Sequence, residues 1–243
     1  MRRVALIPGG ARGSGRAIAQ ALAEREWDVA LCYRTSETDA QIAVNAVEAC
    51  GGSALAVCAD VSHPEVCTEM FDQVLAWRAH IDALVHCAGP FHRVDVLEET
   101  AEGWRAMFAN NLDSLFFLSR LVAPNMMERR WGRILAFGMA NADRIMAQTQ
   151  ITAHYLAKVS VLGLVRSLAK ALAPHHITVN AISPGFIDSG SVDLAELAQM
   201  VKAIPAGNVG SVDDVVAAAL FLLSEEAGYV NGTNIPVSGG WGI

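Results

Sequence analysis

A glycine-rich turn near the start of the sequence combines residue types and spacing that suit phosphate binding. Residues 4–17 form an apolar stretch that runs into glycines at positions 9, 13 and 15 and then into a helical pattern. Gly9 allows a turn with positive φ, Gly13 lets the main chain approach a pyrophosphate, and Gly15 lets the helix pack closely against the sheet. The free N–H groups of Ser14 and its neighbours then attract phosphate oxygens. Because glycines at this spacing also occur in ordinary tight turns, the interpretation depends on the residues after the turn.

The pattern after the turn supplies the setting that a dinucleotide-binding motif needs. An amphipathic helix and a second strand at 27–33 complete a strand–helix–strand unit, and the alternation then continues along the chain. We expect further strands at 53–59, 81–87, 132–137, 177–182 and 233–237, and helices at 36–50, 64–79, 102–130, 149–173, 192–201 and 212–224. This alternation predicts a Rossmann-type, doubly wound α/β fold with a parallel seven-stranded sheet and helices on both faces.

Length and composition narrow the class of protein. We expect residues 1–243 to form one domain, since no Pro/Ser-rich linker or charge run divides them. The absence of an apolar run near the roughly 20 residues of a membrane span, and of a signal-peptide pattern, predicts a cytoplasmic protein without membrane contact. The five cysteines show no CxxC spacing, so we expect reduced thiols and no metal site. A formal net charge of −7 argues against nucleic acid as a partner.

The end of the second predicted strand indicates which cofactor the turn binds. An NAD-preferring site places an acidic residue there, but this sequence reads Arg34-Thr35-Ser36. An arginine with two hydroxyls suits a 2′-phosphate, and Arg12 in the turn adds a second cation, so the pattern predicts NADPH (NADP+). The alternative is a solvated arginine at a strand end. Asp60, after the third strand, suits either a hydrogen bond from an adenine amino group or a helix cap.

Further blocks carry a resemblance that covers nearly the whole chain. Asp60-Val61, the segment His86-Cys87-Ala88-Gly89, Asn111 and the segment 183–189 fall at the positions of known family motifs. Together with the glycine turn, they resemble the short-chain dehydrogenase/reductase family, although Pro8 replaces its usual Thr and His86-Cys87 replaces its Asn-Asn. The resemblance implies that Asn111 is the active-site asparagine. It also implies further cofactor contacts at Val61, Ala88, Gly89, Pro184, Gly185 and Ile187, with Ser189 in place of a threonine.

The residues expected to handle the proton depart from the family pattern. Relatives carry Tyr-x-x-x-Lys, in which the lysine lowers the tyrosine pKa and holds the ribose, whereas this chain has His154-Tyr155-Leu156-Ala157-Lys158. Lys158 matches the motif lysine, so the tyrosine position is His154. At about 100° per residue, position 154 lies roughly 40° from Lys158 around the helix, and position 155 roughly 60° away on the other side. The two side chains therefore do not point to one place.

The family serine is also replaced. Counted forward from the fifth strand it falls on Met139, and counted back from the helix it falls on Asn141. Neither residue has a hydroxyl group, and the difference implies about two extra residues in the loop 138–150. Asn141 or Asp143 can orient a substrate there, without the proton chemistry of a serine.

Three interpretations of His154 stay open. In the first, His154 is a general acid in place of tyrosine, because its ordinary pKa near 6.5 allows proton donation near neutrality. In the second, it is a structural residue beside a working Tyr155. In the third, it belongs to a site that binds NADPH without turnover, in a protein that acts as a sensor or partner subunit.

The leading hypothesis is an NADPH-dependent oxidoreductase that reduces a carbonyl of a small substrate, a ketone, an aldehyde or an acyl-carrier 3-oxo group, with C=C (enoyl-type) reduction as the alternative. Lys158 and Asn111 would hold the ribose and a proton-relay water, His154 or Tyr155 would supply the proton, and Asn141 would orient the acceptor oxygen. The resemblance also implies a homo-oligomer, a tetramer or a dimer, formed through the helices at 102–130 and 149–173. Residues 190–205 correspond to the lid over the substrate, but they do not identify a ligand.

Overall fold

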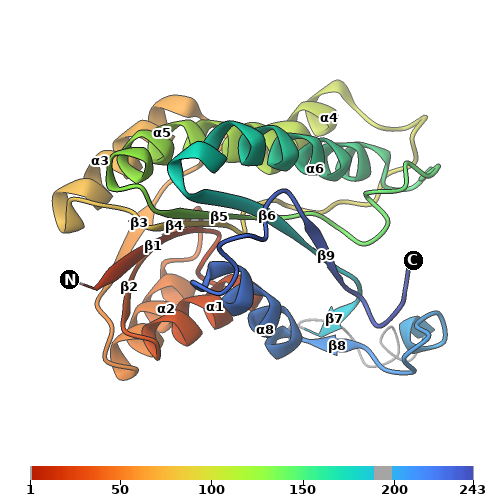
Figure 1. Ribbon diagram of the computed structural model, residues 1–243. Coiled ribbons are helices and arrows are strands. Elements are labelled where there is room, and N and C mark those ends of the chain that lie inside the picture. The colour runs from red at the N-terminus through yellow and green to blue at the C-terminus, as the bar shows by residue number, and fades with distance from the viewer. Residues whose placement is uncertain (1, 189–198, 243) are drawn as a thin grey trace.

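A parallel sheet lies between two layers of helices in the computed structural model, which describes residues 2–188 and 199–242 (Figure 1). The seven-stranded sheet has the order β3-β2-β1-β4-β5-β6-β9, and each of its pairings is parallel. Its strands are β1 (Arg3–Pro8), β2 (Trp27–Tyr33), β3 (Ala54–Cys58), β4 (Ala83–His86), β5 (Gly132–Phe137), β6 (Ile177–Pro184) and β9 (Asn234–Val237). The predicted doubly wound α/β fold and its seven-stranded parallel sheet are confirmed.

The helices cover both faces of the sheet. One layer contains α3 (Pro64–Arg78), α4 (Ala101–Phe108), α5 (Ser114–Arg129) and α6 (Thr152–Leu172), and the other contains α1 (Gly13–Ala23), α2 (Glu37–Ala49) and α8 (Val212–Leu223) (Figure 1). Side chains alternate along the strands, so that Val4 and Leu6 enter one core cluster while Ala5 and Ile7 enter the other. Both faces of the sheet are therefore buried, as the apolar strands require.

The carboxyl ends of the central strands meet at one edge of the sheet. Pro8 at the end of β1 lies opposite Cys32 in β2, and the N–H of Gly9 continues this pairing with a 3.1 Å hydrogen bond to the Cys32 carbonyl. On the other side of β1, the N–H of Cys87 donates to the Pro8 carbonyl at 3.0 Å. This register places the glycine turn between the loops that follow β2 and β4, which is where open α/β sheets bind ligands.

The expected helix at 102–130 is interrupted. Between α4 and α5 the chain makes a π-helical turn, Ala109–Asp113, in which the hydrogen-bond spacing widens by one residue. Such turns are rare and occur frequently at functional sites. The apolar periodicity continues through the interruption, which is why the sequence pattern indicates one helix.

The expected helix at 149–173 begins later than its pattern suggests, at Thr152. The carbonyls of Thr149 and Gln150 accept hydrogen bonds from Val96 and Val94, at 2.8 and 2.9 Å. These bonds join the loop after β5 to the loop after β4 and prevent an earlier helical start. The chain leaves α6 through a short 3-10 turn, Ala173–His175.

A small second sheet pairs β7 (Ile187–Asp188) with β8 (Gly210–Ser211), which the sequence patterns did not indicate. The predicted helix at 192–201 lies largely outside the described residues, and so does Ser189. No helix in the described ranges is long and apolar enough to cross a bilayer.

Candidate cofactor and active site

The glycine turn packs tightly against the loop that follows β4. Gly9 has φ +77°, and a Cβ atom at this position would lie 2.8 Å from the main-chain nitrogen of Ala88. A Cβ atom at Gly15 would lie 2.5 Å from the carbonyl oxygen of Gly9. Helix α1 begins at Gly13 and has no acidic residue in its first turn, so its free N–H groups are well suited to an anion. The turn therefore has the close main-chain packing that the motif requires.

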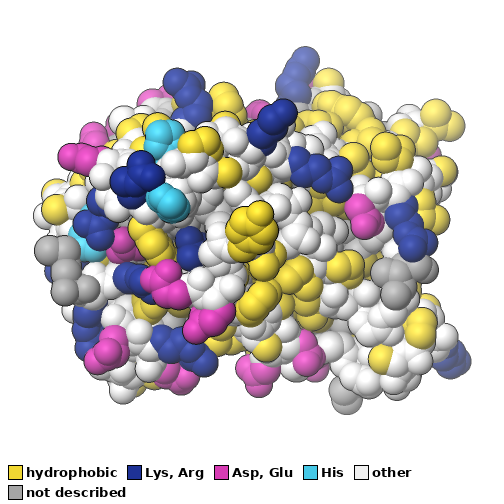
Figure 2. Space-filling model, in the orientation of Figure 1, with side chains coloured by type: hydrophobic (Ala, Val, Ile, Leu, Met, Phe, Trp, Pro, Cys, Tyr) yellow, Lys and Arg dark blue, Asp and Glu magenta, His cyan; other side chains and the backbone are white. Residues whose placement is uncertain are grey.

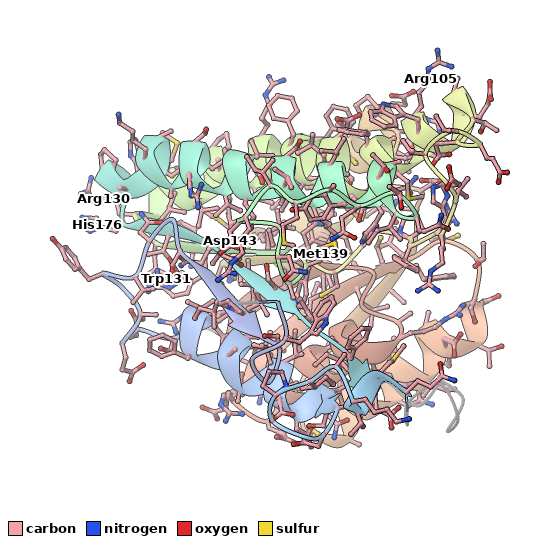
Figure 3. The ribbon with its side chains drawn as sticks, turned by 90° about the vertical axis from the view of Figure 1, so that its right-hand side faces the viewer. Arg105, Arg130, Trp131, Met139, Asp143 and His176 are labelled. Carbon is pink, nitrogen blue, oxygen red and sulfur yellow. The ribbon has the colours of Figure 1, made fainter. Side chains whose placement is uncertain are left out.

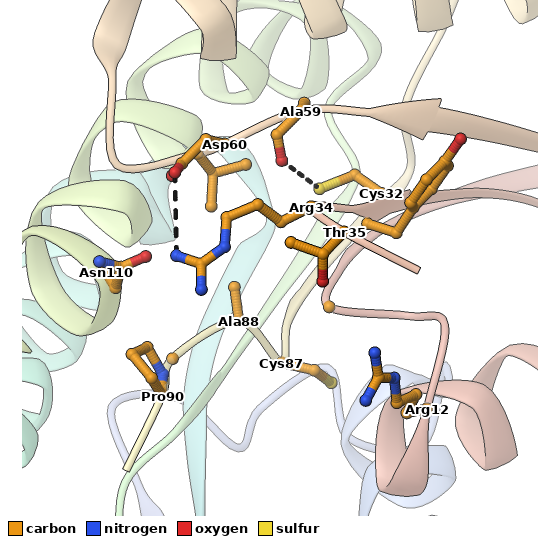
Figure 4. Close-up of a pocket in the computed structure, with 14 residues that line it drawn as sticks. Arg12, Cys32, Arg34, Thr35, Ala59, Asp60, Cys87, Ala88, Pro90 and Asn110 are labelled. Atoms are coloured by element: carbon orange, nitrogen blue, oxygen red, sulfur yellow. Dashed lines mark hydrogen bonds and ion pairs between the residues drawn. The ribbon is translucent and has the colours of Figure 1, made fainter. Parts of the chain in front are cut away.

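A cleft of about 350 Å³ opens beside the turn (Figure 4). Many of the predicted cofactor residues line it: Gly9, Arg12, Arg34, Thr35, Asp60, Val61, Ala88 and Gly89. Other lining residues were not predicted from the sequence: Cys32, Tyr33, Ala59, Cys87, Pro90 and Asn110. Most of these flank the ends of β2, β3 and β4. Their place next to predicted strand ends could have identified them from the sequence. A smaller hollow of about 180 Å³ adds Ser36, whose hydroxyl also accepts the N–H of Asp39 and caps α2.

Two arginines enter this cleft, and each faces a carboxylate. Arg12 Nε lies 2.7 Å from Asp39 Oδ2, and Arg34 Nη1 lies 3.8 Å from Asp60 Oδ2. Figure 4 shows both guanidinium groups in the cleft, with Thr35 between them. Asp60 also accepts hydrogen bonds from the hydroxyl and N–H of Ser62; burial raises the pKa of its carboxyl, but these bonds and Arg34 outweigh burial and lower it.

Lys158 is a buried cation on α6. Its side chain donates a 2.8 Å hydrogen bond to the carbonyl of Phe137 at the end of β5, and the residue is 7% exposed. Burial lowers the pKa of Lys158 from 10.5 to about 8, so the ammonium group stays charged at neutral pH. The lysine thus places a positive charge at the carboxyl edge of the sheet.

His154 lies one turn before Lys158 and is 6% exposed. The ring of Phe91, from the loop after β4, packs against it at a centroid distance of 5.1 Å in an edge-on arrangement. Burial and the charge of Lys158 lower the pKa of His154 to about 4, while the carbonyl of Pro90 acts in the opposite direction. This pKa corrects the expectation of a value near 6.5: His154 is neutral at neutral pH.

Tyr155 has its hydroxyl engaged by the loop after β5. The hydroxyl donates to the carbonyl of Asn141 at 3.0 Å and accepts the N–H of Met146 at 2.8 Å. The residue is 1% exposed. The Tyr155 hydroxyl therefore holds the loop after β5.

Asn111 lies in the π-helical turn between α4 and α5. Its amide nitrogen donates to the carbonyls of Met107 and Pro90, at 2.9 and 3.3 Å. Its amide oxygen is buried and has no hydrogen-bond partner within the part of the chain that the structure describes. A Cβ atom at Gly89 would collide with this oxygen, which explains why glycine, with φ +142°, stands there. Asn111 thus connects the π-helical turn to the loop after β4.

The segment after β5 contains the residues that replace the family serine. Met139 packs against the hydrophobic core, and Asp143 is exposed; Figure 3 labels both. Asn141 has φ +72°, and its buried amide oxygen lacks a hydrogen-bond partner among residues 2–188 and 199–242. Gly242, near the C-terminus, packs against this amide so closely that a side chain there would collide with it. The structure thus brings Asn141 to the same strand edge as Lys158.

The predicted nicotinamide loop leaves the end of β6 beside β9. The N–H of Gly185 donates to the carbonyl of Val237 at 2.9 Å, and a Cβ atom at Gly185 would lie 2.9 Å from Ser238 Cα. The carbonyl of Pro184 accepts the N–H of Ala140 at 3.1 Å, so the loop is also bound to the segment after β5. Ile187 lies in β7. These contacts hold the loop at the carboxyl edge of β5 and β6.

Two further histidines of this region are engaged in hydrogen bonds. His86 Nε2 lies 2.8 Å from Ser114 Oγ, which donates to the carbonyl of Asn110, so the histidine is the donor in this pair. Burial and Lys158 lower the pKa of His86 to about 3. His92 Nε2 lies 2.7 Å from a carboxylate oxygen of Glu99, whose side chain is 8% exposed.

Fold and cleft together define a Rossmann-type protein with a glycine turn of the dinucleotide-binding kind. Comparisons with known proteins extend this result to a family. A family model described as enoyl-(acyl carrier protein) reductase matches residues 9–242. The 3-oxoacyl-[acyl-carrier-protein] reductase FabG of Staphylococcus epidermidis is 32% identical over 245 residues, which cover 99% of this chain and 99% of its own length.

Solved structures agree with this match. A short-chain type dehydrogenase/reductase from Mycobacterium marinum is 29% identical with a TM-score of 0.90, and the match covers 98% of this chain and 94% of the other. An acetoin dehydrogenase from Enterobacter cloacae is 27% identical with a TM-score of 0.89, over 99% and 96% of the two chains. The chain belongs to the short-chain dehydrogenase/reductase family of oxidoreductases.

Proposed function

We propose that this protein is an NADPH-dependent reductase that transfers hydride to the carbonyl of a small substrate, with His154 as the proton donor. The observation that carries the proposal is that His154 and Asn111 both reach the main-chain carbonyl of Pro90, a residue that lines the cleft, and that the charge of Lys158 acts on His154. The names of two relatives, a 3-oxoacyl reductase and an acetoin dehydrogenase, support carbonyl chemistry.

The residues of the cleft fit nicotinamide adenine dinucleotide phosphate. The turn at Gly9 leaves main-chain N–H groups for a pyrophosphate, and Arg12 and Arg34 supply two cations for a 2′-phosphate. The buried amide oxygen of Asn111 and the buried Nδ1 of His154 have no partners in the described part of the chain, as expected of groups that meet a ligand or water. A nicotinamide cofactor bound here supplies the hydride, while the protein supplies position and a proton.

His154 would deliver the proton to the oxygen of the substrate carbonyl. With a pKa of about 4, the ring is protonated in about one molecule in a thousand at pH 7, so proton delivery becomes faster as the pH falls. The neighbouring Lys158 ammonium stabilises negative charge that develops on that oxygen, and it holds ribose hydroxyls. We assign Asn111 to the proton-relay water and Asn141 to the orientation of the acceptor oxygen.

Turnover with chemically distinct acceptors tests this function. The purified protein is mixed with NADPH and, in separate assays, with a 3-oxoacyl thioester, a vicinal diketone or an enoyl thioester, and loss of NADPH absorbance is followed. We expect consumption with at least one carbonyl acceptor. Consumption with the enoyl thioester alone would establish C=C reduction instead.

One observation favours a second candidate, a cofactor-binding relative without turnover. Met139, one of the two positions at which the family serine falls, packs against the hydrophobic core and has no hydroxyl group. Tight NADPH binding without consumption of any acceptor would support this alternative.

We also propose a cytoplasmic homo-oligomer, a tetramer or a dimer, that forms through α4, α5 and α6. Trp104 and Phe116 on the first two of these helices are 38% and 40% exposed. Figure 2 shows hydrophobic side chains gathered over the end of the molecule where α4 lies in Figure 1. Light scattering that returns a monomer would contradict this assembly.

A further inference from the structure

We propose that Asp39 limits the preference of this cleft for a 2′-phosphorylated cofactor, because its carboxylate pairs with Arg12 and places a negative charge beside the phosphate position. The inference rests on the proposed NADPH function. It assigns a role in specificity to a residue that lies outside the glycine turn and outside the segment after β2.

The geometry holds Asp39 and Arg12 together from two different elements. Asp39 lies in the first turn of α2, where its N–H donates to Ser36 Oγ at 3.2 Å. Its Oδ2 lies 2.7 Å from Arg12 Nε, in the glycine turn. The ion pair joins Asp39 Oδ2 to Nε of the guanidinium group, whose two terminal NH₂ groups are further donors for an anion. Figure 4 shows the Arg12 guanidinium directed toward Thr35.

The charges of the cleft nearly balance. Arg12 faces Asp39, and Arg34 faces Asp60 at 3.8 Å. A phosphate monoester carries about −1.5 to −2 charges at neutral pH. The two guanidinium groups therefore attract the 2′-phosphate, and the two carboxylates repel it. A cofactor without the 2′-phosphate places little charge at this position. Carboxylates near the arginines therefore reduce the affinity for NADPH more than the affinity for NADH.

Of the two carboxylates, Asp39 is the one whose charge can be removed cleanly. Asp60 accepts two hydrogen bonds from Ser62 and lies where an adenine amino group is expected, so its replacement would disturb both nucleotides. The side chain of Asp39 is 30% exposed and that of Arg12 is 64% exposed. An ion pair this exposed is weak, so it does little to fix the Arg12 side chain in place. Repulsion of the phosphate therefore outweighs any benefit from holding Arg12.

The variant Asp39→Asn isolates this charge. The asparagine places a neutral amide at the position of the carboxylate near Arg12 Nε. It leaves the main-chain N–H of residue 39, which donates to the α2 cap residue Ser36, unchanged. The matched control is Glu37→Gln, which removes a carboxylate from the same first turn of α2. Arg12→Gln serves as the opposite control, because it removes the attracting cation.

The experiment is fluorescence titration of NADPH and of NADH against the wild-type chain and the three variants. Asp39→Asn is expected to bind NADPH roughly threefold to tenfold more tightly, with NADH binding unchanged within about twofold, and added KCl should reduce the gain. Glu37→Gln should leave the ratio of the two affinities unchanged. Arg12→Gln should weaken the binding of NADPH and leave the binding of NADH unchanged.

Two failures are distinguishable. If the wild-type chain binds NADPH but Asp39→Asn leaves that affinity unchanged or weakens it, this inference is overturned while the proposed function stands. If the wild-type chain binds neither nucleotide, the proposed function and this inference are both overturned.

Discussion

The hydroxyl of Tyr155 donates a hydrogen bond to the main-chain oxygen of Asn141, 3.0 Å away, and its neighbour His154 packs against Phe91 instead. Adjacent residues of one helix thus serve different loops. Replacement of Tyr155 by Phe should lower the free energy of unfolding by about 0.5–1.5 kcal/mol, because it removes the two partly buried hydrogen bonds of the hydroxyl. It should change kcat for carbonyl reduction by no more than a few-fold.

Urea unfolding and steady-state kinetics of this variant measure the two quantities separately. A loss of about a hundredfold in kcat with unchanged stability would identify Tyr155, rather than His154, as the proton donor.

The low pKa of His154 predicts an unusual pH dependence for reduction. If the protonated ring delivers the proton, kcat/KM should rise by about tenfold for each pH unit between about pH 7.5 and 5.5, since this range lies above the pKa of about 4. A His154→Gln variant has no titratable group at this position, so its kcat/KM should lack this tenfold rise per pH unit. A flat profile for the wild-type chain would contradict donation by the imidazolium form.

Local sequence patterns predict those site residues that lie at strand ends or in a single turn. Gly9 and Arg34 were predicted in this way, because each depends on its neighbours in the chain and on the alternation of strands and helices, whereas Lys158 was predicted from the family motif that it matches. Cys87 and Pro90 were missed as cleft residues, because their position depends on how the loop after β4 folds back against the glycine turn.

Burial explains the remaining difference between the sequence-based picture and the structure. The pKa of His154 is lowered first by burial and then by the charge of Lys158, and no spacing along the chain reports how deeply a side chain is buried. The π-helical turn around Asn111 was equally hidden, because apolar periodicity continues through it.

The buried Lys158 predicts a pH-dependent contribution to stability. Its pKa falls from 10.5 unfolded to about 8 folded, so between these values the unfolded chain binds more protons and stability rises with pH. The difference in unfolding free energy between the wild-type chain and a Lys158→Met variant should therefore rise by roughly 3 kcal/mol from pH 8 to 10.5, at about 1.4 kcal/mol per pH unit. Denaturant unfolding across this range measures it. A difference that does not change with pH would show that Lys158 is not desolvated.

The buried His86 predicts that the folded protein loses stability at low pH. Its pKa of about 3 in the folded state lies below the ordinary 6.5, so its contribution to stability is complete above pH 6.5 and is lost as the pH falls toward 3. A His86→Asn variant removes this titration and keeps a donor for Ser114. We expect acid unfolding of the variant at lower pH than that of the wild-type chain, as followed by circular dichroism. Coincident acid transitions would contradict the burial of a neutral His86.

The most direct test of the proposed function compares the wild-type chain with a His154→Gln variant in NADPH-dependent reduction of a 3-oxoacyl thioester or a diketone. NADPH titration of both proteins serves as the control for cofactor binding. We predict that the wild-type chain consumes NADPH, and that the variant binds NADPH within about twofold of the wild-type affinity but loses at least about a hundredfold in kcat. Equal rates for the two proteins, or no consumption by the wild-type chain with either carbonyl, would contradict a carbonyl reductase that uses His154.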